Sequence, residues 1–180
     1  SLVRPDDPEP FRPAQVVCGF DVAYDAASDL VAGAVVALAA PDWRVIAQAT
    51  VVRRADFPYV PGLFSFRELP ALLDAWRRLA LPRRPDLLVC DGYGLAHPRR
   101  FGLACHVGVT LDLPTVGVAK TRFVGSYSAP GPRRGDHSPI LLDGEEVGCA
   151  LRTQPGVREV FVSVGHRTNL PAAVRHVLAL

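Results

Sequence analysis

Residues 85–120 read PDLLVCDGYGLAHPRRFGLACHVGVTLDLPTVGVAK, and this stretch decides the fold. Residues 87–90 form a continuous apolar run, which is typical of a strand buried on both faces of a sheet. The run ends on Asp91, where two glycines within three residues predict a sharp turn. We expect a helix at about 98–110 and a further strand at 114–119. Asp91 is therefore predicted to lie at the carboxyl end of a buried strand, where open α/β sheets place their ligands.

The rest of the chain supplies more strands and two more helices. The expected elements are strands at 15–24, 30–39 and 43–53, a loop at 56–67, a helix opened by Glu68, a mobile loop at 125–138, a hairpin of strands at 139–142 and 146–152, a strand at 160–164 and a final helix from about 171. A meander of three strands followed by alternating helices and strands favours an α/β fold, with a central mixed β-sheet flanked by helices. That order suits a ribonuclease H-like fold. We expect an N-terminal tail at 1–15 and a single domain at 16–180.

The composition predicts a packed globular protein that is neither disordered nor membrane-bound. Of the 180 residues, 49% are hydrophobic, yet no apolar run is long enough for a membrane helix. The net charge is only +2, so affinity for nucleic acid has to come from local clusters such as the pairs of consecutive arginines. Four widely spaced cysteines in apolar segments, without zinc-binding spacing, predict buried free thiols and a cytoplasmic location. We also expect the protein to act as a monomer.

Three acidic residues are candidates for a metal site. Asp21 lies within the first predicted strand, where an unpaired charge is costly unless it is hydrogen-bonded or binds a metal. If its strand neighbours that of Asp91, the two carboxylates converge and favour a hard cation such as Mg²⁺ between them. Glu68 follows a loop that brings aromatic residues to the same place. The plain alternatives are a turn or edge position for Asp21 and a helix-dipole effect for Glu68.

Two further residues follow strands. Lys120 comes directly after the strand at 114–119, where it would neutralise a reacting phosphate or only solubilise the strand end. His166 follows a strand and a glycine, which suggests a place near the rim of the sheet. A histidine there would position a water nucleophile or bind metal, although a solvent-facing side chain is the ordinary explanation.

Several long motifs occur in a fixed order and resemble the endonuclease V family. They are GFDVAY, FPYVPGLFSFRELP, DGYGLAHPRRFGLACHVGVTLDLPTVGVAK and VSVGHR, and together they cover the chain from about residue 16 to its end. The resemblance implies a ribonuclease H-like fold and a DNA repair endonuclease that requires Mg²⁺, with Mn²⁺ as a substitute. It implies cleavage beside deaminated purines, chiefly hypoxanthine, at the second phosphodiester bond 3′ to the lesion, leaving a 3′-hydroxyl and a 5′-phosphate.

The same resemblance assigns roles to the candidate residues. Asp21 and Asp91 become metal ligands, and Glu68 becomes a third, direct or water-mediated, ligand. Lys120 and His166 become catalytic residues.

Residues for substrate binding also follow from the matched motifs. Tyr59 matches the wedge residue that fills the gap left when the lesion nucleotide leaves the stack. The turn Gly92-Tyr93-Gly94 is expected to form part of the lesion pocket, with Phe64 and Leu103 as candidate walls. For Phe64 and Leu103, core packing is the alternative.

Three alternatives to a deoxyinosine endonuclease stay open at this point. The first is an inosine-specific endoribonuclease of the same family, because nothing in the sequence reads a 2′-hydroxyl. The second is another metal-dependent nuclease of the same fold, against which the PYVPG loop and the VGHR motif argue. The third is a non-catalytic nucleic-acid-binding relative, which would be expected to lack one of the three carboxylates.

Overall fold

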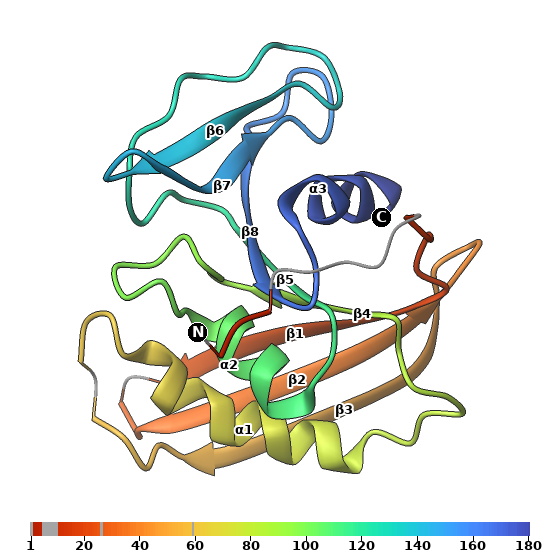
Figure 1. Ribbon diagram of the computed structural model, residues 1–180. Helices are drawn as coiled ribbons and strands as arrows, with labels where there is room; N and C mark the ends of the chain where they lie inside the picture. The colour runs from red at the N-terminus through yellow and green to blue at the C-terminus, as the bar shows by residue number, and fades with distance from the viewer. Residues whose placement is uncertain (1, 5–10, 26, 59) are drawn as a thin grey trace.

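The computed structural model describes residues 2–4, 11–25, 27–58 and 60–180. Within these residues, eight strands form one mixed sheet and three helices pack on it (Figure 1). In chain order the elements are β1 (Val16–Asp25), β2 (Leu30–Ala39), β3 (Arg44–Arg54), α1 (Phe64–Arg78), β4 (Leu87–Asp91), α2 (Leu103–Leu111), β5 (Thr115–Ala119), β6 (His137–Leu142), β7 (Glu145–Leu151), β8 (Val160–His166) and α3 (Leu170–Ala179). The predicted strands are confirmed to within two residues at either end.

The strand order determines which residues lie together at one edge of the sheet. The strands lie in the order β3-β2-β1-β4-β5-β8-β7-β6. The first three form the predicted antiparallel meander, while β4 pairs with β1 and β5 pairs with β4 in parallel. Because these three strands are parallel, the residues that follow the paired segments of β1 and β4 and the end of β5 lie at the same edge of the sheet. This is the mixed sheet expected for a ribonuclease H-like fold.

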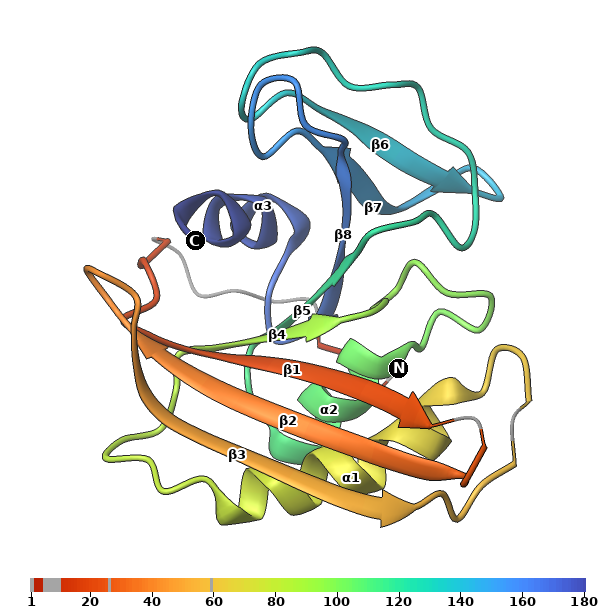
Figure 2. The same cartoon turned by 180° about the vertical axis from the view of Figure 1, so that it is seen from behind.

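The two faces of the sheet are covered by different helices, as the opposite views in Figures 1 and 2 show. Leu88 and Cys90 of β4 are fully buried with residues of α1 and α2, whereas Leu87 is buried with Ala173 and Val174 of α3. Alternate side chains of a strand point to opposite faces, so β4 is apolar along its length because both of its faces are covered.

Two helices begin elsewhere than predicted. The helix expected at 98–110 begins only at Leu103, because Arg100 adopts a left-handed conformation (φ 52°) and Gly102 has an extended one. Conversely, α1 begins at Phe64, four residues before the predicted start at Glu68. The predicted loop at 56–67 is therefore shorter, and Glu68 lies in the second turn of the helix.

The four cysteines are buried and form no disulfide, which confirms the predicted free thiols. The segment expected to be a tail has buried members, since Val3 and Ala14 are 6% and 7% exposed. Among the described residues, no helix has the length and apolar content that crossing a bilayer requires.

Candidate active site

The structure places Asp21 and Asp91 side by side on neighbouring strands. In the parallel pairing of β1 with β4, Phe20 lies opposite Cys90, so the residue that follows each is an aspartate. Both aspartates are exposed, and the carboxylate of Asp21 accepts a hydrogen bond from the backbone N–H of Val22 (2.8 Å). The sequence predicted that the two carboxylates would converge if their strands were neighbours, and the strands are neighbours.

Lys120 joins this pair from the end of β5. Its Nζ lies 2.9 Å from Oδ2 of Asp91, and the two side chains form an ion pair. The hydrogen bond from Lys120 to Asp91 and the charge of Asp91 raise the pKa of the lysine, and the charge of Asp21 adds to this effect. A fixed positive charge therefore lies beside the carboxylates, next to where a phosphate would approach them.

Glu68 faces the two aspartates from α1. Burial raises its pKa to about 7, and the negative charges of Asp91 and Asp21 add to the rise, while a hydrogen bond from the hydroxyl of Tyr24 (2.6 Å) opposes it. The helix-dipole explanation for Glu68 does not hold, because the first turn of α1 contains no acidic residue. Three carboxylates from β1, α1 and β4 are thus close enough to affect one another.

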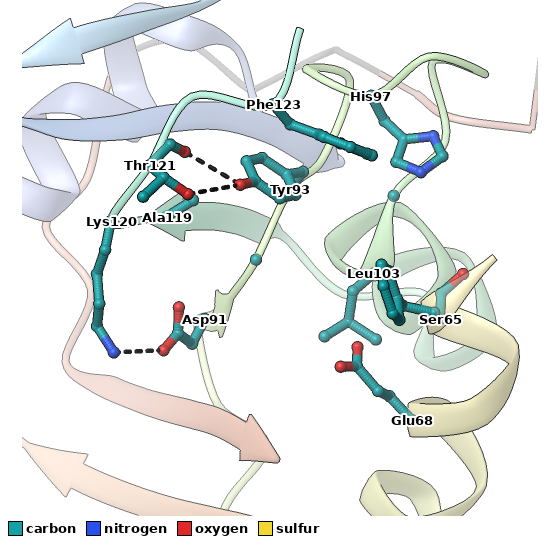
Figure 3. Close-up of a pocket in the computed structure, with 13 residues that line it drawn as sticks. Ser65, Glu68, Asp91, Tyr93, His97, Leu103, Ala119, Lys120, Thr121 and Phe123 are labelled. Carbon is teal, nitrogen blue, oxygen red and sulfur yellow. Dashed lines mark hydrogen bonds and ion pairs between the residues drawn. The ribbon is translucent and has the colours of Figure 1, made fainter. Parts of the chain in front are cut away.

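A cavity of about 410 Å³ opens beside these residues, and Glu68, Asp91 and Lys120 are part of its lining. Figure 3 shows Lys120 and Asp91 on one side of the cavity, with Glu68, Leu103 and Ser65 facing them. A second groove runs on from Asp91 and Lys120 to Asp21 and along the sheet. The charged residues therefore lie where two hollows of the surface meet.

Most of the substrate-binding residues predicted from the sequence line the cavity. Phe64, Gly92, Tyr93 and Leu103 do so. Gly94 is not part of the lining, because its backbone packs against β8 and its N–H donates to Oγ of Ser163 (2.8 Å). The predicted wedge Tyr59 lies outside the described residues.

The sequence analysis missed six residues that line the same cavity. They are Ser65, His97, Gly102, Ala119, Thr121 and Phe123. The ring of Phe123 lies 5.1 Å from that of Tyr93 and 5.5 Å from that of His97, so three rings from two loops form one wall. The hydroxyl of Tyr93 donates to the carbonyl of Thr121 (3.1 Å), which joins the two loops. Only Ala119 and Thr121 carry a signal in the sequence, because they flank Lys120.

The structure does not bring His166 to this site. In the antiparallel pairing of β5 with β8, His166 lies opposite Thr115, at the other end of β5 from Lys120. Its imidazole is buried beside Asp112, which caps the end of α2, and its Nε2 lies 3.3 Å from Oδ1 of Asp112. It therefore neither faces solvent nor approaches the three carboxylates.

The carboxylates suit a metal that needs few protein ligands. The described part of the chain holds no group of three His, Cys, Asp or Glu side chains set to bind a metal ion by themselves. Mg²⁺ does not require such a group, because it keeps several waters and binds through one or two carboxylates together with substrate phosphates. Asp21 and Asp91 could supply that pair, and the mutual repulsion that contributes to the raised pKa of Glu68 is what a cation would relieve.

Known proteins with the same architecture are found by sequence and by structure. The family model for endonuclease V matches residues 2–180. The chain is 55% identical over 175 residues to the endonuclease V of Streptomyces avermitilis, covering 97% of this chain and 76% of the relative. The crystal structure of that enzyme matches with a TM-score of 0.92 at 54% identity, covering 99% of this chain and 78% of that one.

More distant members share the fold. The catalytic domain of human endonuclease V matches with a TM-score of 0.89 at 34% identity, covering 99% of this chain and 81% of that one. The Ciona intestinalis endonuclease V, in complex with a 24-mer DNA containing an inosine followed by a ribo-adenosine, matches with a TM-score of 0.82 at 24% identity, over 98% of this chain and 82% of that one. With a family model that matches almost every residue and a relative of more than half identity, the chain belongs to the endonuclease V family.

Proposed function

We propose that this protein is a Mg²⁺-dependent endonuclease of DNA repair, with Mn²⁺ as a substitute metal, that recognises deaminated purines and chiefly hypoxanthine. It hydrolyses the second phosphodiester bond 3′ to the lesion and leaves a 3′-hydroxyl and a 5′-phosphate. The observation that carries this proposal is the placement of Asp21, Asp91, Glu68 and Lys120 at the lip of a cavity large enough for a base.

Each charged residue at the site has a separate role in this proposal. Asp21 and Asp91 would hold the metal, with Glu68 as a third ligand, direct or through water. A bound Mg²⁺ would supply charge stabilisation for the phosphate and a more acidic water. Lys120 would release its hydrogen bond to Asp91 and offset the charge that develops on the phosphate oxygens.

The cavity next to these residues suits a base that has left its stack. A nuclease that recognises an altered base needs a pocket that encloses the base and contacts its edge. Phe64, Leu103 and Tyr93 offer apolar and aromatic walls, and Gly92 lets the backbone approach closely. Because the pocket for the base adjoins the carboxylates without coinciding with them, the cut is expected at a fixed offset from the lesion.

A cleavage assay distinguishes DNA from RNA as the substrate. Single-stranded DNA and RNA oligonucleotides of matched sequence, each with one inosine, are incubated with enzyme and Mg²⁺, and parallel samples contain EDTA. We expect Mg²⁺-dependent cutting 3′ to inosine in DNA, in agreement with the inosine-containing DNA held by the Ciona enzyme. Cutting of the RNA alone would support the endoribonuclease alternative, and no cutting of either by folded protein would overturn the proposal.

A further inference from the structure

A strip of positive charge continues from Lys120 away from the carboxylates. The last pair between β5 and β8 joins Ala119 to Phe161 in an antiparallel register. Arg122 follows Lys120 by two residues, and Arg158 precedes the start of β8 at Val160 by two residues, so both belong to the chain next to this end of the β5–β8 pair. Lys120 and Val160 line the same groove as Asp21, so this strip begins at the proposed metal site.

The two arginines of the strip have no acidic partner. Both residues are exposed, and among the described residues neither guanidinium takes part in an ion pair or a hydrogen bond. The neighbouring acid, Glu159, is already engaged, because Arg152 lies 3.1 Å from its Oε2 and the hydroxyl of Tyr127 donates to its Oε1 (3.0 Å).

Two observations indicate that Arg122 and Arg158 lie near one another. The guanidinium of Arg122 lies over the ring of Tyr127, with Cζ 6.0 Å from the ring centroid. Burial and the carboxylate of Glu159 raise the pKa of Tyr127, and the positive charges of Arg122 and Arg158 both oppose this rise. The two guanidinium groups therefore share one small patch around Tyr127.

Many other arginines of this protein are neutralised by a neighbouring carboxylate. Those in ion pairs with aspartate or glutamate are Arg53, Arg67, Arg77, Arg83, Arg100, Arg133, Arg152 and Arg167. Several other arginines, Arg44 among them, also lie outside the ion pairs of the described residues. Arg122 and Arg158 differ in that they lie together around Tyr127 and close to Lys120, so their positive charge is available to an external anion next to the proposed site.

We propose that Arg122 and Arg158 form a phosphate-binding track that continues from Lys120 and holds the substrate strand on one flank of the bond that is cut. The inference rests on the proposed function, because it takes the carboxylates as the place of cleavage. Arginine binds phosphate oxygens through a planar set of donors, and backbone contacts of this kind fix register without reading sequence. The track therefore contributes to affinity and to placement of the strand, and it leaves the recognition of the lesion to the cavity.

The test is the salt dependence of binding without divalent cations, measured on a labelled single-stranded oligonucleotide with no inosine. The proteins are the wild type, the double variant Arg122→Ala/Arg158→Ala and the control Arg44→Ala. Arg44 is exposed at the start of β3, on the far edge of the sheet, so its removal changes the net charge but not the track. All variants alter exposed side chains, and unfolding curves check that each is folded.

Each lost phosphate contact lowers the slope of log K against log salt by about 0.7 for single strands. We therefore expect the slope of the double variant to fall by about 1.4, whereas that of Arg44→Ala is expected to match the wild type. In cleavage of an inosine-containing strand, the KM of the double variant should rise while kcat is retained. A double variant with the same slope as Arg44→Ala would overturn the proposal.

Shortened substrates separate this inference from the proposed function. Oligonucleotides that end close to the inosine on the 5′ side or on the 3′ side remove one flank at a time. The loss of binding affinity in the double variant, relative to the wild type, should vanish with one of these substrates and persist with the other. A loss that persists with both contradicts a track on one flank. If the wild type does not cut beside inosine, but the salt slopes of the wild type and the double variant still differ, only the proposed function is overturned.

Discussion

The hydroxyl of Tyr24 donates a hydrogen bond of 2.6 Å to Oε1 of Glu68, and this bond joins β1 to α1 across the edge of the proposed metal site. Tyr24 lies three residues after Asp21 on the same strand, and the guanidinium of Arg67 lies 5.6 Å from the centroid of its ring. A carboxylate that is held in this way keeps one oxygen occupied and leaves the other available to a metal. Tyr24 therefore fixes the orientation of Glu68.

Removing this hydroxyl should weaken the response to metal. Tyr24→Phe keeps the ring but not the donor, and losing a partner of a metal-binding carboxylate typically costs 10- to 100-fold in metal affinity. Because Glu68 is one of three ligands, we expect the Mg²⁺ concentration for half-maximal cleavage to rise about tenfold, with kcat recovered at high Mg²⁺. Tyr127→Phe, which removes the same group from its bond to Glu159, is the control. Equal Mg²⁺ dependence in the two variants would refute the role of Tyr24.

The raised pKa of Glu68 predicts a pH dependence of stability. Its carboxyl has a pKa of about 7 in the folded protein against 4.5 ordinarily, so the folded state binds more protons between these values. The free energy of unfolding contributed by Glu68 therefore falls as pH rises through this window, and it stays low above it. Glu68→Gln removes this titration.

Urea unfolding in EDTA, at about pH 5 and about pH 8, checks this sign. Relative to the wild type, Glu68→Gln should be more stable at the higher pH than at the lower one. Asp74→Asn, on the same helix but in ion pairs with Arg53 and Arg77, is a control that should show no such gain. A wild type and a Glu68→Gln variant that differ equally at both pH values would show that Glu68 is an ordinary exposed acid.

Gly94 is expected to be required for the fold, although it lies in a motif that resembles a substrate-binding turn. A Cβ at this position would lie 1.9 Å from the carbonyl oxygen of Val164, so the chain would have to move away from β8. We expect Gly94→Ala to lower the free energy of unfolding by about 3 kcal/mol or more, at the upper end of overpacking effects.

Gly19→Ala is the matched control, because its Cβ meets only the carbonyl oxygen of Val36 at 4.0 Å. Chemical denaturation of both variants gives the comparison. A Gly94→Ala protein as stable as Gly19→Ala would mean that the turn does not pack on β8 as described.

His166 should affect stability and leave the chemistry alone. Its imidazole is buried, accepts the backbone N–H of Arg4 at Nδ1 (3.3 Å) and contacts Asp112. His166→Ala leaves the backbone N–H of Arg4 without its acceptor, while Asp112 keeps its ion pair with Arg167 (2.6 Å), and we expect a loss of about 1–3 kcal/mol in the free energy of unfolding. At a temperature where the variant is fully folded, kcat should equal that of the wild type. A large fall in kcat with unchanged stability would restore a catalytic role.

The sequence predicted the strands well because their signal is local. Residues 87–90 are apolar without a break, and the structure covers both faces of this strand. The glycine turn that begins at Gly92 marks the end of this strand, so Asp91 could be predicted to lie at the site. Both aspartates could be found because each follows a buried apolar residue on a strand, Phe20 and Cys90.

The direction of a strand has no such local signal, which explains why His166 was misplaced. The predicted strand at 160–164 is followed by a glycine and His166, which suggested a place at the rim of the sheet. Because β8 runs antiparallel to β5, its end lies at the opposite edge from Lys120. The start of α1 was missed for a related reason. Leu63 precedes the helix without any capping hydrogen bond from its side chain, so no capping residue marks the boundary.

Apart from Tyr93, the aromatic wall of the cavity could not be predicted from the sequence. His97 and Phe123 belong to irregular segments without periodicity, and they meet only because β4 and β5 are neighbours in the sheet. Loop residues of this kind are brought together by tertiary structure, and their spacing in the sequence says nothing about it.

The central claim is that carboxylates from β1, α1 and β4 cut a strand at a fixed distance from a base held in the cavity. Mapping the cut at nucleotide resolution, on end-labelled DNA with a single inosine, tests this most directly. With Mg²⁺, the wild type should yield one product that ends on the nucleotide 3′ to inosine. Asp91→Asn should lower the rate by roughly 10³-fold, which corresponds to several kcal/mol of lost charge stabilisation. Cuts scattered along the strand, or a single cut that Asp91→Asn leaves unchanged, would contradict the account.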